Sequence, residues 1–138
     1  MNKIEVIQQL RSARRAHLRW VKSTNALIQG IPLDKNQVPI ESTDCTFGQW
    51  YNRASDDIQA IPGFEEINQP HEMLHSIYRE IFMLLIPEKK KGLISRLFDS
   101  KPVVSEKNTQ KAQILFQLLK EQSDLVVEQL DRMEQQLL

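Results

Sequence analysis

The chain has 138 residues, 41% of them hydrophobic, so we expect one domain with a single modest core. Its 18 basic and 18 acidic residues cancel, which excludes binding to nucleic acid or to an anionic membrane through net charge. The chain opens without a signal-peptide pattern, has no apolar run of about 18–20 residues, and contains a single cysteine. Together these features exclude an internal disulfide and favour a cytoplasmic protein.

A first helix is predicted from about Lys3 to Ile28. Apolar residues recur at helical spacing along one of its faces, and basic residues cover much of the remainder. The apolar face comprises Ile4, Ile7, Leu10, Ala13, His17, Val21 and Ile28, with Trp20 and Leu27 beside it. Gly30 and Pro32 are expected to end this helix.

Residues 30–44 contain two prolines and show no periodicity, which predicts an extended loop. A short second helix should follow, running from Cys45 to about Asp56, with Ser42, Thr43 and Asp44 as candidate N-caps. Its apolar residues are Phe47, Trp50, Tyr51 and Ala54, and the pattern is broken by Ile61, Pro62 and Gly63.

The third helix ends at Pro87 and carries His71, Leu74, His75, Tyr78, Ile81, Phe82 and Leu85 at helical spacing. The fourth should begin at Ser105, a good N-cap, and run to the C-terminus, over about 45 Å. No segment has a convincing strand pattern. We therefore expect an all-α fold, an antiparallel up-and-down four-helix bundle with a short second helix, and a single domain over residues 1–138.

Residues 87–104 form a basic insertion between the third and fourth helices. Lys89, Lys90, Lys91, Arg96 and Lys101 surround the apolar Leu93, Ile94, Leu97 and Phe98. A short basic amphipathic segment of this kind could contact an acidic partner or a membrane surface. The alternative, which we favour, is a solvated loop whose apolar residues cap the end of the bundle. We therefore expect no stable membrane anchoring.

All three histidines and the one cysteine occupy positions from which a metal can be bound. His71 and His75 are four residues apart, so their rings project from the same side of one helix. His17 lies on the apolar face of the first helix, where a histidine needs a polar partner. Cys45 precedes the second helix, whose N-terminus favours a thiolate. Three nitrogens and one sulfur suit tetrahedral zinc.

The same residues also allow a reading without metal. An inward-facing histidine is often a hydrogen-bonded core residue, and a lone cysteine is often an inert small hydrophobe. From spacing alone, a metal site and a metal-free helical scaffold stay equally open.

The order and spacing of these residues resemble a known family. The sequence reads His17-x-x-Trp20, then 24 residues, Cys45-x-Phe47-Gly48-x-Trp50, then 20 residues, and His71-x-x-x-His75. This pattern is similar to that of the bacterial chemoreceptor zinc-binding (CZB) domain. The resemblance implies that His17, Cys45, His71 and His75 bind Zn²⁺. It also implies a regulatory domain of chemoreceptors or diguanylate cyclases that reports zinc or oxidants such as hypochlorous acid.

The other residues of the motif are expected to pack around the site. Trp20 lies one turn after His17 and should shield the site from water, and Phe47 and Trp50 should do the same from the second helix. Gly48 should let a neighbouring helix approach closely. For the aromatic residues, plain core packing is an equally valid description.

His71-Glu72-Met73-Leu74-His75 also matches the H-E-x-x-H helix of zinc proteases, with Glu72 as the catalytic base. A hydrolase needs an open metal position for water, whereas a cysteine and a third histidine are available here to close the shell. We therefore expect no enzyme activity and keep zinc hydrolysis as a remote alternative.

Four ligands of one ion must lie at one level of the bundle. The third helix should therefore begin near residues 62–64, with Pro70 inside it and kinking it. The alternative is a helix that begins at Pro70, preceded by an irregular segment over 64–69. We favour the kinked helix.

Taken together, the sequence predicts a zinc- and redox-responsive sensor in which Cys45 is the oxidisable ligand. It is expected to signal through a protein partner such as a chemoreceptor or diguanylate cyclase, either as a stand-alone chain or as part of a longer protein. A stand-alone bundle could also dimerise through an exposed helix. The main alternative is an interaction module for which zinc is a permanent structural staple.

Overall fold

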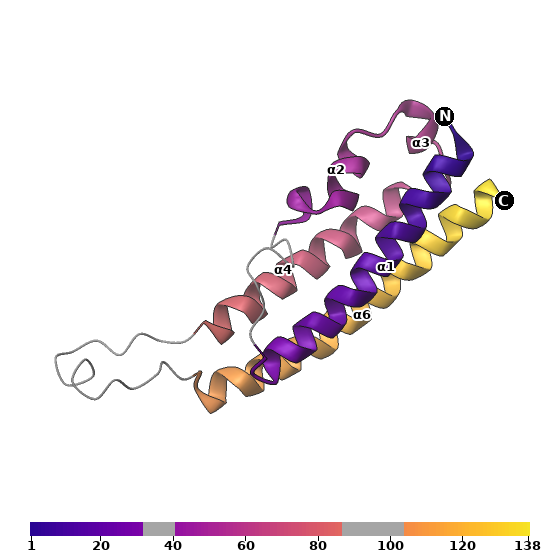
Figure 1. The fold of residues 1–138 in the computed structure, drawn as a ribbon. Helices are drawn as coiled ribbons and strands as arrows, with labels where there is room; N and C mark the ends of the chain where they lie inside the picture. Colours follow the sequence, from indigo (N-terminus) through magenta and orange to yellow (C-terminus); the bar gives the residue numbers. More distant parts are fainter. Residues whose placement is uncertain (32–40, 87–103) are drawn as a thin grey trace.

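The computed structural model describes residues 1–31, 41–86 and 104–138, and every regular element in these ranges is helical (Figure 1). The elements are α1 (Lys3–Ile28), the 3-10 turn η1 (Ser42–Asp44), α2 (Thr46–Asn52), α3 (Asp56–Gln59), the 3-10 turn η2 (Glu65–Ile67), α4 (Asn68–Leu85) and α6 (Glu106–Leu137). The predicted all-α class is confirmed. The predicted loop over 32–40 and most of the basic insertion, residues 87–103, lie outside the described residues.

The three long helices are organised around α6. Both α1 and α4 pack along α6 and contact each other much less. Both termini lie at one end of the molecule: α1 and α4 lead away from it, and α6 returns to it (Figure 1). The short segment that carries η1 and α2 contacts both helices, since α2 contacts α1 and η1 contacts α4.

The two longest helices have the predicted bounds because their caps are encoded locally. The Asn2 side chain accepts hydrogen bonds from the Ile4 and Glu5 amides at the start of α1. At its end Gly30 adopts φ +91°, and the Ile31 amide donates to the Ala26 carbonyl, which is a Schellman motif. Ser105 accepts from the Asn108 amide and caps α6, as predicted.

The predicted caps of the second helix were wrong. Ser42, Thr43 and Asp44 form the 3-10 turn η1, and the N-cap of α2 is Cys45, whose Sγ accepts from the Gly48 amide at 3.1 Å. The second helix is also interrupted: α2 ends at Asn52, and a single further turn, α3, begins at Asp56.

Neither predicted start of the third helix was right. The helix α4 begins at Asn68, so Pro70 lies in its first turn, where the missing amide costs no helical hydrogen bond. The 3-10 turn η2 runs directly into α4, with Ile67 and Asn68 both in helical conformation. Because Pro70 cannot donate to the carbonyl of Glu66, the chain before it forms the tighter 3-10 turn instead of an α-helix with a kink.

The core consists of two apolar clusters that share α1 and α6. One joins the first half of α1 to α2, residues 61–67 and the second half of α6; the other joins the second half of α1 to α4 and the start of α6. Ion pairs between Arg11 and Glu134 and between Arg14 and Asp131 also join α1 to α6. No helix in the described part of the chain is long and apolar enough to cross a membrane.

Candidate metal centre

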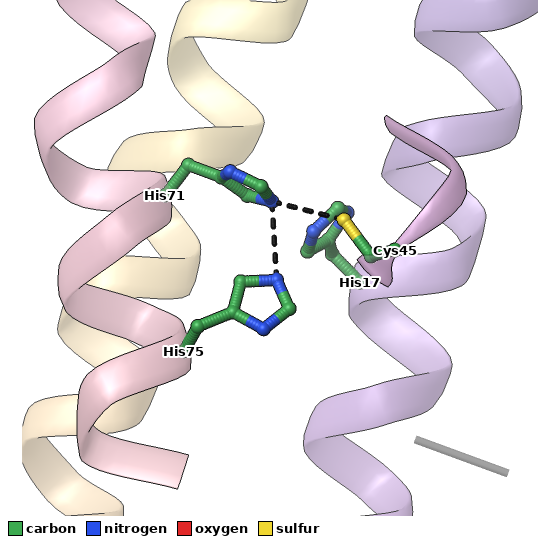
Figure 2. Close-up of side chains that lie close together, drawn as sticks. All are labelled: His17, Cys45, His71 and His75. Atoms are coloured by element: carbon green, nitrogen blue, oxygen red, sulfur yellow. Dashed lines mark hydrogen bonds between the residues drawn. The ribbon is translucent and has the colours of Figure 1, made fainter. Parts of the chain in front are cut away.

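Four buried side chains from three separate segments meet between α1 and α4. His17 comes from α1, Cys45 from the residue before α2, and His71 and His75 from α4, and all four point toward one another (Figure 2). The three histidines are each 3% exposed and Cys45 is 8% exposed. One ligand atom from each residue lies within 4.8 Å of the others. The structure therefore brings together all four residues that the sequence singled out.

The spacing of the donor atoms fits one tetrahedral zinc ion. His71 Nε2 lies 3.2 Å from His75 Nε2 and 3.4 Å from Cys45 Sγ. Around a zinc ion with the usual bond lengths, two nitrogens lie about 3.3 Å apart, and a nitrogen and a sulfur about 3.6 Å. These two separations fit Zn²⁺, and the remaining donor atoms, all within 4.8 Å of one another, would have to move closer to complete the shell.

His17 is oriented by its own helix. Its Nδ1 lies 2.7 Å from the carbonyl oxygen of Ala13, one turn earlier in α1. Because a carbonyl only accepts, Nδ1 carries the proton and donates it, which leaves Nε2 with a free lone pair for a metal. The sequence did not identify this acceptor, although the carbonyl four residues before any helical histidine is within reach.

Cys45 is held by a tight turn of backbone. Besides accepting from the Gly48 amide, its Sγ lies 3.3 Å from the Ser42 carbonyl oxygen. A Cβ atom on Gly48 would lie 1.7 Å from that same oxygen, so only glycine fits. Gly48 was expected to let a neighbouring helix approach closely. The segment that approaches it is instead the 3-10 turn η1, directly before α2.

Burial keeps the histidines neutral. Burial, together with the smaller effect of the nearby rings of His17 and His75, lowers the pKa of His71 to about 3. Burial likewise lowers the pKa of His17, against the opposing effect of its bond to Ala13. Burial raises the pKa of the Cys45 thiol, while the Gly48 and Phe47 amides act in the other direction. Neutral imidazole is the form that binds metals, so the histidines need lose no proton to do so.

Aromatic rings enclose the four residues, as the sequence predicted for Trp20 and Phe47. The Trp20 ring lies 4.3 Å from that of His75, and the Phe47 ring meets His71 edge-on at 4.9 Å. Trp50 is half-buried and packs behind Phe47, at 5.8 Å between ring centroids. Trp20 and Phe47 therefore form the wall of the site, and Trp50 supports that wall.

The H-E-x-x-H motif does not assemble a protease site. His71 and His75 face inward, but Glu72 is exposed on the outer side of α4. A hydrolase would use three protein ligands and leave the fourth position to water, whereas Cys45 and His17 both lie within reach of an ion bound by the two histidines of α4. The described residues therefore offer four protein donors to one ion.

Comparison with known families supports the same interpretation. Residues 17–82 match the family model described as the chemoreceptor zinc-binding domain, which confirms the resemblance seen in the sequence. The matched segment contains all four clustered residues and stops before α6. Comparisons with curated proteins and with solved structures found no match.

Proposed function

Because residues 17–82 match the chemoreceptor zinc-binding domain family, we propose that this chain is a zinc-binding regulatory domain. In this proposal His17, Cys45, His71 and His75 hold one Zn²⁺ in a closed shell. The state of that site is passed to a partner protein, of the chemoreceptor or diguanylate cyclase type. The observation that carries the proposal is the convergence of three imidazoles and one thiol within 4.8 Å in a buried position.

The cluster makes physical sense mainly as a metal site. Buried polar groups destabilise a fold unless they are paired, and the partners of the His71 ring are other members of the cluster, His75 and Cys45. Since α1 and α4 pack on α6 more than on each other, ligands from both helices on one ion would join them directly. Structural zinc can contribute on the order of 10 kcal/mol to the folding of small domains.

The proposed response to oxidant acts through Cys45. Hypochlorous acid transfers oxygen to a thiolate, giving a sulfenic acid and chloride, and a sulfenic acid is a poor zinc ligand. The three histidines then hold the ion less tightly, and the join between α1 and α4 weakens. The proposed signal is this change in helix packing, which a partner bound to these helices would detect.

The proposal also concerns the fold, the cellular location and the partners of the chain. Residues 1–138 are taken as one domain, an antiparallel up-and-down four-helix bundle in which residues 46–59 occupy the second position and residues 87–104 are a basic insertion. A cytoplasmic location, a protein partner and a second copy of the chain as a further partner all belong to the proposal. Neither nucleic acid nor a stable membrane anchor is part of it.

The sensor is tested by measuring zinc release and helix packing together. The zinc-loaded chain is treated with hypochlorite, and free zinc is followed with a chromogenic chelator while amide hydrogen exchange is measured in α1 and α4. We expect release of one zinc per chain and faster exchange in both helices. The Cys45→Ala variant should show neither oxidant effect.

The same experiment distinguishes the sensor from the main alternative, an interaction module with a permanent structural zinc. If zinc is a permanent staple, oxidant and chelator should leave both the metal content and the exchange rates unchanged. Zinc retained in full by Cys45→Ala would also contradict the sensor proposal, because it would show that the thiol is not a ligand.

A further inference from the structure

Residues 41–45, here called the cysteine hook, are attached to α4 by an ion pair. Glu41 Oε1 accepts from Arg79 Nη1 at 2.8 Å. Arg79 follows His75 by four residues and His71 by eight, so the three side chains lie along one side of α4. The ion pair therefore joins the segment that supplies the sulfur to the helix that supplies two of the nitrogens.

Backbone contacts within the hook link Glu41 to the Cys45 sulfur, so a movement of Glu41 is expected to move the sulfur. The Asp44 amide donates to the Glu41 carbonyl at 3.1 Å, which closes the turn. Ser42 packs against both Gly48 and the Cys45 Sγ, and η1 contacts α2 and α4. Because the Ser42 carbonyl lies against both Gly48 and the Cys45 sulfur, the hook and the first turn of α2 are expected to move as one unit.

Cys45 is buried, whereas the two side chains of the ion pair are exposed. Cys45 is 8% exposed, whereas the side chains of Arg79 and Glu41 are 51% and 53% exposed. A reagent in solution can therefore reach the sulfur more readily after the hook lifts from α4. An exposed ion pair contributes little to stability and is weakened by salt, so it suits a contact that opens easily.

We propose that the Arg79–Glu41 ion pair is a latch that controls how fast Cys45 leaves the metal site and becomes open to attack. This inference rests on the proposed function and concerns the regulation of the same site. Arg79 and Glu41 are positioning residues and touch no ligand atom of the cluster. Breaking the pair is therefore expected to change rates while one zinc per chain is still bound.

The test uses the zinc-loaded full chain with Arg79→Ala, Glu41→Ala and the charge swap Glu41→Arg/Arg79→Glu. The matched control is Arg132→Ala, which breaks an exposed pair to Glu128 of the same length, 2.8 Å, within α6. Zinc release to a chelator and the reaction of Cys45 with a thiol reagent are timed at low and high salt. Circular dichroism checks that each variant keeps its helix content.

We expect both single variants to release zinc roughly two- to fivefold faster than the wild type, the range expected for an exposed pair. The charge swap should restore most of the difference, and Arg132→Ala should match the wild type. Salt should speed release from the wild type but not from Arg79→Ala. Equal rates in Arg79→Ala and Arg132→Ala, with one zinc in each, would overturn the latch.

Failure of the proposed function gives a different result. If the purified wild type binds no zinc, the zinc proposal fails, and the reaction rate of the Cys45 thiol in the metal-free variants still tests the latch. The same ordering of variants is expected there, and identical rates would again overturn it.

Discussion

The amide of Gly48 donates a hydrogen bond to the Sγ atom of Cys45 at 3.1 Å, so the sulfur that faces His71 also caps α2. A helix N-terminus stabilises a negative charge on its cap, so this amide opposes burial, which raises the pKa of the thiol. The start of α2 and the candidate metal site therefore depend on the same atom.

Gly48→Ala should damage both the hook and the site. The added Cβ would lie 1.7 Å from the Ser42 carbonyl oxygen, so the backbone of the hook has to move. We expect a loss of about 1–3 kcal/mol in the free energy of unfolding, as for other overpacked sites, together with weaker zinc binding. Urea unfolding and competition with a zinc chelator measure the two effects.

Gly30→Ala is the matched control for that variant. Gly30 has φ +91° and no atom within 4 Å of an added Cβ, so its replacement strains the backbone far from the cluster. It should lower stability by about 1 kcal/mol and leave zinc affinity unchanged. If the two glycine variants bind zinc equally well, the close fit of Gly48 to the hook does not matter for the site.

Trp20 should tolerate phenylalanine but not alanine. Its ring packs on His75, while its buried Nε1 finds no hydrogen-bond acceptor among the described residues. Trp20→Phe removes the unpaired N–H and keeps an aromatic ring, so we expect stability and zinc content close to those of the wild type. Trp20→Ala should lose about 3–5 kcal/mol through the cavity it leaves. Thermal unfolding of the two variants side by side checks this difference.

Acid should destabilise the metal-free protein. The pKa of His71 is lowered to about 3 in the folded chain, from an ordinary value of 6.5, and that of His17 is lowered as well. Between these values the unfolded chain binds protons that the folded chain does not, so the free energy of unfolding falls as pH falls through this window. We expect the urea midpoint of chelator-treated protein to be lower at pH 5.5 than at pH 7.5.

A His71→Gln variant provides the control for this effect. It removes the group whose pKa is lowered to about 3, so its urea midpoint should depend less on pH over the same range. A wild-type midpoint that does not change between the two pH values would contradict the account of the histidines as neutral, buried groups.

The long helices could be predicted from the sequence because their signals are repeated or local. The apolar stripe of α1 recurs along a helix of 26 residues that Gly30 follows, and Ser105 is a strong N-cap for α6. Residues 41–70 could not be placed as well, because each element there is only a few residues long. Cys45 serves as a cap although cysteine is not a typical one, and Pro70 is compatible with either a kink or a first turn.

The four residues of the candidate site could also be identified from the sequence. The contacts that hold them in place could not. Four chemically suitable residues in a long spaced motif are visible in one sequence. The Ser42 carbonyl that fits against Gly48, the Ala13 carbonyl that orients His17, and the Arg79–Glu41 pair leave no such pattern. Backbone acceptors have no sequence identity, and exposed charges occur all along this chain, so these contacts become visible only in the folded structure.

The most direct test of the central claim is the absorption spectrum of the chain loaded with Co²⁺ in place of Zn²⁺. Cobalt in a tetrahedral site with one thiolate gives intense visible bands and a sulfur-to-metal charge-transfer band in the near ultraviolet. We predict both at one cobalt per chain, displacement of the cobalt by one equivalent of zinc, and loss of the charge-transfer band in Cys45→Ser. A weak octahedral spectrum, or a charge-transfer band that survives in Cys45→Ser, would contradict the four-ligand site.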